Sequence, residues 1–570
     1  MHNFLLIIFL ISFNFIFSQT GPGGVGNSSS NLVWLSSDQV SGITDGTNLS
    51  SWNDISGNGN NFTQPNSSYT PIYKTNIVNG RPTVRFNKTN GRLRKTNFTT
   101  FPSTAITEIY VNINTESSDG ILSYASSAHN NDFLLFSSNN LRIYRATHRT
   151  SGVSFNDNLW HIGQTSWQSS GGNLEVWKDG NRSYTNTGHR TGTSITSGGC
   201  LSLAGEQDAP DASYQSSQAH FGDFTEVLVY NTYLNETQHI IIANYLSAKY
   251  NIALSANNLY TQDTPSAGDF DHEVAGIGRL SATDLHNDAQ GSSIVRILNP
   301  SNLDDNEFLI WGHDNATLGS YSSTDFPPSL QGRLQRVWRV SETNKSTSSS
   351  ADVGNIDIRF DLAGLGAVTV SDLRLLVDSD NDGFFNDETP ISGAIHVEGS
   401  IYQFSAQSAI EDNLRFTMGT INISQTPLPI QLLAFNATLN KNKTVDLNWT
   451  TVSEVDNNYF SVEKSSDAIN WYDVSTLNGA GNSNTEINYH SVDETPYVGI
   501  NYYRLKQVDF DGNHTYSSIK KIELKSEVLN DLHVYTNPSK NLVTIYSDHS
   551  NLKDLAIYNS LGQKINLNNY

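Results

Sequence analysis

Apolar and polar residues alternate in short runs along the first part of the chain. In the segment 223–231, "DFTEVLVYN", Val227 and Val229 share one face when residues are counted in steps of two. Clusters of Gly, Asn, Ser and Asp separate this run from similar ones, such as 173–180, "NLEVWKDG". A period of two indicates strands, and short strands divided by turn residues are typical of a β-sandwich or jelly roll. We therefore predict an all-β fold that begins with a jelly roll.

One helical pattern closes this region, in "LNETQHIIIANYLSAKY" (234–250). Asn235 is placed as the N-cap and Gln238 follows three residues later, which is the arrangement of a capping box. The apolar positions of the helix share one face: Ile241, Ile242, Tyr245 and Leu246. We expect this helix to pack against the jelly roll.

Further β-rich segments follow the helix. A polar stretch (255–268) leads to the second of them, and the Pro-bearing "SQTPLP" (424–429) leads to the third. In the third, Val445, Leu447 and Trp449 are expected to point inward, as are Tyr503 and Leu505, and Asp511-Gly512 fits a hairpin turn. The predicted organisation is a leader, a jelly roll, two further β-sandwich domains and a small terminal β-unit: 1–18, 19–254, 255–425, 426–525 and 526–570.

Charge limits the partners. The 570 residues carry 34 Lys and Arg against 56 Asp and Glu, a formal net charge of -22. Such a field repels phosphate backbones, so we expect no nucleic-acid partner, and it attracts divalent cations. Cys200 is the only cysteine, so the chain has no internal disulfide.

The N-terminal apolar run, Phe4 to Phe17, is followed by the small residue Ser18. This pattern predicts a cleaved signal peptide, although no Lys or Arg precedes the run. No other segment approaches 18 uninterrupted apolar residues, so we expect no transmembrane span in the mature chain. The predicted location is secreted or on the outer cell surface.

The first domain resembles the laminin-G/pentraxin family, whose fold is a concanavalin A-like jelly roll. The likeness lies in the order of "SYASSAHNNDFLLF", "WHIGQTSWQSSGGNLEVWKDG" and "GEQD", with a glutamine ten residues further on. The cysteine pair typical of pentraxins is absent, and Gly163 occupies one of its positions. Two positions that carry acids in the family are amides here, Asn130 and Gln215. The resemblance implies calcium ligation by Asn130, Asn131, Glu206, Gln207, Asp208 and Gln218; the alternative is a solvated loop whose oxygens cap turns.

A second calcium candidate is "DSDNDGFFNDE" (378–388). Asp378, Asp380 and Asp382 alternate, Gly383 permits a sharp turn, and the carbonyl of Phe384 would be a fourth ligand. Position twelve is Thr389 rather than Glu and a strand precedes the loop, so it is no EF-hand. Asp387 or Glu388 would complete the shell. The alternative is an acidic surface turn without an ion.

The remaining domains resemble modules of exported proteins of Bacteroidota. "FLIWGHDNATL" and "LQGRLQRVWRVSET" resemble a domain of unknown function found beside laminin-G modules, and the third domain resembles a fibronectin-III-like module. The terminal "VYTNPSKNLVTI" and "LAIYNSLGQKI" resemble the type IX secretion sorting domain. That likeness implies contact with the type IX export machinery, although Thr536 replaces the usual proline and the family's closing strands do not follow before Tyr570.

Three functions are compatible with this sequence. The leading one is a surface or secreted adhesion protein that binds an extracellular glycan, or another polar surface ligand, through a calcium-supported jelly roll. The second is an accessory or catalytic component of polysaccharide breakdown, because "DFDHE" places Asp269, Asp271 and Glu273 on one face if that segment is extended. The third is a structural spacer. No metalloprotease, serine-hydrolase or phosphate-loop motif is present.

Overall fold

The computed structural model of the chain describes most of its residues. These are residues 20–423, apart from 41, 88–90, 115–116, 292, 317, 319–320, 323 and 364–367; residues 432–524, apart from 442, 452–453, 484–486 and 510–513; and residues 532–535, 544–547, 557–558 and 563–565. The predicted signal peptide (1–18), the linker 424–429 and the turn at Asp511-Gly512 lie outside them. The chain divides into two compact units at Pro429.

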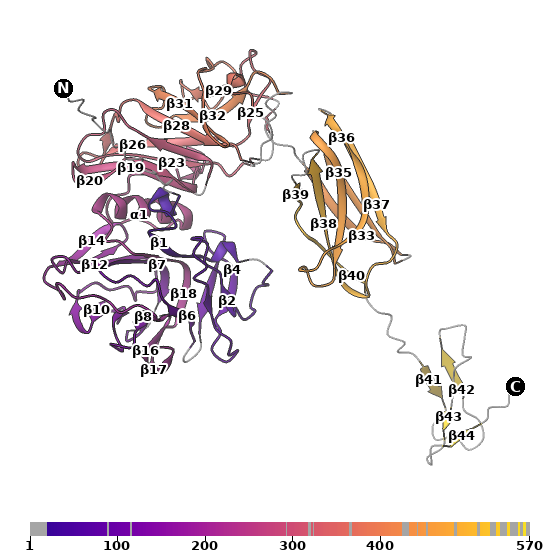
Figure 1. Ribbon diagram of the computed structural model, residues 1–570, viewed down its shortest axis with the longest axis horizontal. Helices are drawn as coiled ribbons and strands as arrows, with labels where there is room; N and C mark the ends of the chain where they lie inside the picture. Colours follow the sequence, from indigo (N-terminus) through magenta and orange to yellow (C-terminus); the bar gives the residue numbers. More distant parts are fainter. Residues whose placement is uncertain are drawn as a thin grey trace, which may run out of the picture. The chain divides into compact units, whose positions relative to one another are not determined.

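The predicted N-terminal jelly roll is present as two antiparallel sheets (Figure 1). The first runs β14 (Asn181–Asn186), β13 (Leu174–Lys178), β12 (Trp160–Gln168), β7 (Ala105–Asn114), β18 (Gly222–Tyr230), β5 (Arg81–Phe86), β4 (Ile72–Val78), with β1 (Asn31–Ser36) also on β18. The second runs β11 (Thr147–Thr150), β10 (Arg142–Arg145), β9 (Phe133–Phe136), β8 (Gly120–Ala125), β15 (Gly199–Leu203), β6 (Leu93–Phe98), β3 (Phe62–Thr63), β2 (Ser51–Trp52). A separate hairpin joins β16 (Gly205–Ala209) to β17 (Ala212–Ala219).

Strand β18 is buried on both faces. Val227 and Val229 belong to the core between the two sheets, as their period of two predicts. Leu228 and Tyr230 point the other way and join a second apolar cluster, which contains the helix. This is why the segment reads as a nearly continuous apolar run rather than a strict alternation.

The helix α1 (Glu236–Tyr250) begins with the predicted capping box. The Asn235 side chain accepts from the Gln238 backbone N–H at 2.9 Å, and the Gln238 side chain accepts from the Asn235 N–H at 3.1 Å. Almost every residue of α1 is buried, including those outside the predicted apolar face. The helix therefore has buried neighbours on more than one side.

Those neighbours include the second β-domain (residues 255–423). Val274, Phe308 and Ile310 of that domain share one apolar cluster with α1 and β18. The polar stretch after the helix is also fixed, because the Asn244 side chain accepts from the backbone N–H groups of Leu259 and Tyr260 at 2.8 and 3.0 Å. Figure 1 shows α1 between the jelly roll and the second β-domain, which together form one compact unit.

The second β-domain has two antiparallel sheets around its own core. One runs β20 (Asp284–His286), β19 (His272–Ser281), β23 (Glu307–His313), β26 (Trp338–Asn344), β32 (Arg415–Thr420), β25 (Gly332–Leu334), β24 (Tyr321–Ser322), with β27 (Ser349–Ser350) on β26 and β29 (Leu373–Asp378) on β32. The other runs β21 (Asp288–Gln290), β22 (Val295–Leu298), β28 (Ile356–Asp361), β31 (Ile401–Gln407), β30 (Ile395–Glu398). Short 3-10 turns lie at η1 (Pro22–Gly24), η2 (Ser37–Gln39), η3 (Pro265–Ala267) and η4 (Val370–Asp372).

The C-terminal unit begins with another sandwich. Its sheets are β33 (Leu432–Leu439), β34 (Val445–Thr451), β37 (Ile487–Asp493), and β36 (Tyr472–Ser483), β35 (Glu454–Ser465), β38 (Gly499–Asp509), β39 (His514–Tyr516), with β40 (Lys520–Leu524) on β38. All five residues predicted to point inward are in its core. Two strand pairs follow: β41 (Leu532–Tyr535) with β42 (Thr544–Ser547), and β43 (Ile557–Tyr558) with β44 (Lys564–Ile565).

The family assignments of this unit stay predictions. The sandwich has the all-β architecture expected of a fibronectin-III-like module, which does not by itself identify the family. In the small terminal unit, Thr536 and Asn537 lie outside the described residues. Within the described part of the chain, no helix is both long and apolar enough to cross a bilayer.

A glycine lies opposite an aromatic residue within the first sheet. Gly163 on β12 pairs directly with Tyr110 on β7. A Cβ on Gly163 would lie 2.4 Å from the Tyr110 ring, so the aromatic ring occupies the space that a side chain would need.

The same sheet contains a buried acid. Glu108 on β7 is fully buried, and neither carboxylate oxygen has a hydrogen-bond partner among the described residues. Burial disfavours the charged form and raises the pKa of Glu108 from 4.5 to about 8. The folded state thus keeps a proton that the unfolded chain releases near its ordinary pKa. This contribution to stability is complete below the unfolded pKa of 4.5 and is lost as the pH rises to about 8.

We expect Glu108→Gln to remove this pH dependence while preserving the shape of the side chain. One pKa unit corresponds to about 1.4 kcal/mol of unfolding free energy. The free energy of unfolding of the variant, relative to that of the native chain, should therefore be a few kcal/mol higher at about pH 8 than at about pH 5. Urea unfolding of the N-terminal unit at both pH values measures this. Glu398→Gln, at an exposed position on β30, is the control. If the variant and the native chain differed in unfolding free energy by the same amount at both pH values, the prediction would be wrong.

Candidate functional site

The β16–β17 hairpin carries most of the oxygens that the family resemblance predicts as ligands. It lies at one end of the jelly roll in Figure 1, beside β8. In this hairpin Gly205 pairs with Ala219, and Gln207 pairs with Tyr214. Gln218 directly precedes Ala219, so it lies near Gly205 at the start of β16. The loop between β8 and β9 brings Asn130 and Asn131 to the same end.

Glu206 is the most unusual group of this hairpin. Its side chain is buried, and its Oε2 atom has no hydrogen-bond partner among the described residues. Burial, and then the negative charge of Asp208, raise the pKa of Glu206 to about 7. A buried carboxylate oxygen without a donor is under-satisfied, and a bound cation would satisfy it.

Three amides surround the two carboxylates. Asn130 Nδ2 donates to one oxygen of Asp208 at 3.2 Å, and Gln215 Nε2 donates to the other at 2.6 Å. When the oxygen and nitrogen of the Asn131 side-chain amide are exchanged, the orientation that satisfies both atoms, the nitrogen donates to Glu206 Oε1 at 3.1 Å. Each amide also has an oxygen, which a rotation would turn toward a cation.

The Gln207 side chain is engaged elsewhere. It is fully buried, its Nε2 donates to the carbonyls of Ser123 and Cys200 at 2.7 and 2.8 Å, and its Oε1 accepts from the Asp211 N–H at 2.9 Å. These bonds hold β16 on the second sheet. Only the main-chain carbonyl of Gln207 is left as a candidate ligand.

This donor set fits a single calcium ion. Calcium takes about six to eight oxygen ligands in irregular geometry, with carboxylates, amide oxygens and carbonyls all acceptable. The orphaned Glu206 oxygen supports the fit. Among the predicted ligands only Glu206 and Asp208 are carboxylates, which predicts weaker binding than a site in which Asn130 and Gln215 are acids.

The second predicted site begins where β29 ends. Asp378 is fully buried and accepts from the backbone N–H groups of Asp382 and Gly383 at 3.0 Å each. Asp380 accepts from the Asp382 N–H at 3.2 Å, and Gly383 has a φ of +97°, as its predicted turn requires. Arg415 pairs with Asp378 at 2.8 Å and neutralises part of its charge.

The loop brings the predicted acids together. Carboxylate oxygens of Asp378, Asp380 and Glu388 lie within 4.8 Å of one another, and so do those of Asp380, Asp382 and Asp387. The Phe384 side chain is exposed, whereas the neighbouring Phe385 is buried and anchors the loop. The arrangement can present several hard oxygens to one cation, with Glu388 and Asp387 as the completing groups that the spacing suggested.

The acids of "DFDHE" do not form the extended face considered for a glycosidase. Asp269 and Glu273 have positive φ values of 61° and 48°, and β19 begins only at His272. Glu273 accepts from His313 and Arg336, at 2.8 and 3.4 Å. These groups hold the pKa of Glu273 below its ordinary value, although burial opposes them, which is unsuited to a general acid.

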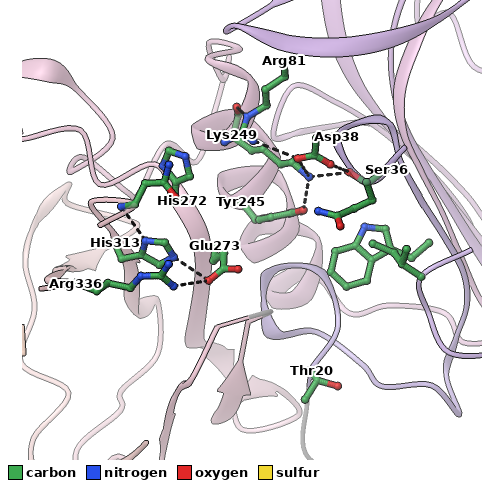
Figure 2. Close-up of a pocket in the computed structure, with 14 residues that line it drawn as sticks. Thr20, Ser36, Asp38, Arg81, Tyr245, Lys249, His272, Glu273, His313 and Arg336 are labelled. Atoms are coloured by element: carbon green, nitrogen blue, oxygen red, sulfur yellow. Dashed lines mark hydrogen bonds and ion pairs between the residues drawn. The ribbon is translucent and has the colours of Figure 1, made fainter. Parts of the chain in front are cut away.

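Sequence patterns missed the pocket to which Glu273 belongs. Figure 2 shows it between α1 and the strands of the second β-domain, with a volume of about 540 Å³. Its residues come from positions as distant as Trp34 and Arg336. No local motif joins them; the charged "DFDHE" was the one signal in the sequence that points to this place.

Comparisons with known proteins agree with the jelly-roll fold of the first domain. Residues 94–265 match the Pentaxin family, and residues 238–414 match a domain of unknown function, DUF8202. The N-terminal unit thus contains a Pentaxin-family jelly roll. The two matches overlap at α1 and the stretch after it.

Curated relatives cover little of the chain. It is 32% identical over 89 residues to the Sushi, von Willebrand factor type A, EGF and pentraxin domain-containing protein 1 of Rattus norvegicus, and 30% identical over 95 residues to that of Mus musculus. These segments are 16% and 17% of this chain, and only 2% and 3% of the relatives.

Solved structures include a heptameric SAP-like pentraxin of Limulus polyphemus (19% identity, 28% of this chain, 76% of that chain, TM-score 0.25). Another is domain 4 of the extracellular arabinanase AbnA of Geobacillus stearothermophilus, in complex with arabinotriose (12% identity, 38% of this chain, 98% of that chain, TM-score 0.27). A third is Trypanosoma rangeli sialidase in complex with sialic acid (16% identity, 41% of this chain, 36% of that chain, TM-score 0.26). At these scores the likenesses carry no functional argument.

Replacing both Asp380 and Asp382 with Asn should abolish calcium binding by the 378–388 loop, because two of its charged ligands become neutral. A calcium concentration about 100 times the Kd stabilises a one-site protein by about 2.7 kcal/mol, so the variant should lose an increment of that order. Titration calorimetry and thermal unfolding with and without calcium measure it. Asp304→Asn, an exposed acid of the same domain, is the control. Unchanged calcium stoichiometry in the double variant would exclude the loop as a site.

Proposed function

We propose that this protein is an exported, extracellular adhesion protein that binds carbohydrate through a calcium-supported jelly roll. The observation that carries the proposal is the under-satisfied carboxylate of Glu206, beside Asp208 and three rotatable amides, at one end of a Pentaxin-family domain. An acidic chain favours divalent cations over anionic partners.

In this proposal Glu206 and Asp208 hold the ion, assisted by oxygens of Asn130, Asn131, Gln218 and the Gln207 main chain. These residues would hold the ion, which would supply positive charge to attract the hydroxyl oxygens of a glycan. The protein groups shape the rim: the Asn130 and Gln215 amides each offer both a donor and an acceptor, which matches the mixed hydrogen bonding of sugar hydroxyls. A glycan is therefore the favoured ligand among polar surface ligands.

The proposed location is outside the cell. It rests on the apolar N-terminal run and on the resemblance of the terminal segment to the type IX sorting domain, with the export machinery as a transient partner. The C-terminal sandwich would then act as a spacer that separates the binding unit from the sorting segment. An immunoblot of culture medium and of intact, protease-treated cells tests this location.

Glu206→Gln and Asp208→Asn should each weaken calcium-dependent glycan binding about tenfold or more, since calcium affinity follows the number of charged ligands. A glycan array probed with the full-length protein, in calcium and in chelator, measures this. Glu398→Gln and Asp304→Asn, which change charge equally on exposed residues elsewhere, are the matched controls. Binding of native protein that is equal in calcium and in chelator would refute the calcium-supported mechanism. An array on which no glycan is bound would refute the carbohydrate function itself.

A further inference from the structure

A polar recess of the N-terminal unit lies where the jelly roll meets the second β-domain (Figure 2). Its volume of about 540 Å³ is in the ordinary range for small-molecule sites, ~300–1,000 Å³. The jelly roll contributes Trp34, Asp38, Ile55 and Arg81 among others, and α1 contributes Tyr245 and Lys249. The second β-domain contributes His272, Glu273, His313, Asn315 and Arg336. We call it the interdomain pocket.

Formal charges in this pocket are balanced. Arg81 lies 3.2 Å from Asp38, and Lys249 lies 2.8 Å from Glu226 behind it. On the opposite wall, Arg336 lies 3.4 Å from Glu273. With Glu226 counted behind the wall, the three cations Arg81, Lys249 and Arg336 are each paired with a carboxylate, so the pocket has no excess charge to attract a simple anion or cation.

The second β-domain adds two histidines. His313 is buried, and that burial lowers its pKa, so it is neutral at neutral pH. His272 is partly exposed, and its Nδ1 atom lies 2.5 Å from an Asp271 carboxylate oxygen. The two rings stack at 5.8 Å between centroids. The two histidines therefore add imidazole nitrogens to this wall.

Polar atoms of the wall are still free to bind a ligand. Among the described residues, Nη2 of Arg81 and Nη2 of Arg336 have no hydrogen-bond partner, while Nε and Nη1 of both side chains do. Nδ1 of His272 also lacks a hydrogen bond to any described residue. Carboxylate oxygens of Asp38 and Glu273 line the same space. Both donors and acceptors are thus available within one cavity.

An apolar surface completes the pocket. Trp34 and Ile55 lie in its lining, and Ile55 is 40% exposed. Trp34 is held in place by its indole N–H, which donates to Glu226 at 2.8 Å. Balanced charge, free donors beside acceptors, and an apolar and aromatic side together match a polyhydroxylated, uncharged molecule, whose hydroxyls both donate and accept while its C–H faces pack on apolar side chains.

We propose that the interdomain pocket is a second, calcium-independent carbohydrate site that binds one neutral sugar unit. The proposal rests on the proposed carbohydrate function, which it extends to a place remote from the calcium ligands. The walls are rigid, because α1 and the strands on either side of it share one apolar cluster. Binding therefore requires both domains together.

The test uses the full-length protein in excess EDTA, with galactose, mannose, xylose and arabinose as probes and saturation-transfer NMR and calorimetry as readouts. At least one of these sugars should bind. Ile55→Trp and Gln39→Trp fill the pocket from exposed lining positions and should raise its Kd about tenfold or more, since each removes contacts worth about 1.4 kcal/mol. Ile395→Trp, exposed on β30, is the matched control and should change nothing. Thermal unfolding confirms that each variant is folded.

Galacturonate is a further probe, because it differs from galactose by a carboxylate. Balanced charge predicts that it binds no more tightly than galactose, and tighter binding would overturn the assignment to a neutral sugar. Absence of any EDTA-resistant binding, or equal binding by native protein and both filled variants, would overturn the site. If either result is obtained while the array still shows calcium-dependent glycan binding, the function proposed for the jelly roll is unaffected. EDTA-resistant binding without any calcium-dependent binding would support this pocket and refute the jelly-roll site.

Discussion

A single buried carboxylate determines how the N-terminal unit is assembled. Glu226 on β18 accepts hydrogen bonds from Trp34 on β1 and from Tyr245, Lys249 and Tyr250 on α1, at 2.5 to 2.8 Å. A buried charge is tolerated only when it is paired and fully hydrogen-bonded, so these donors must all be in place. The need to satisfy Glu226 therefore fixes the rotation and height of the helix on the sheet.

The fixed helix then becomes part of the second domain. Its remaining faces pack on β19 and β20, and the apolar cluster around α1 contains residues of both domains. The overlap of the two family matches at residues 238–265 reflects the same fact. Because the helix is shared, the interdomain pocket has walls that neither domain could form alone.

The two cation candidates differ in their physical state. At the β16–β17 hairpin, Glu206 is buried without a full set of donors, so its pKa is raised and a cation would relieve an existing penalty. In the 378–388 loop, backbone N–H groups and Arg415 already satisfy Asp378, and the more exposed acids provide negative charge at the surface. The first candidate couples a cation to the jelly roll, whereas the second would mainly order a loop.

The sequence by itself determined the local elements: the period-two strands, the capping box at Asn235, and the spacing that brings Asp378, Asp380 and Glu388 into one loop. It also indicated, through a family resemblance, that Glu206 and Asp208 belong together. Only the tertiary structure decided that α1 is buried on several sides, that the Gln207 side chain holds a strand rather than facing a ligand, and that Asp38 and Arg336 line one pocket. The reason is physical: hydrophobic period and capping act over a few residues, whereas a pocket depends on which distant surfaces bury one another.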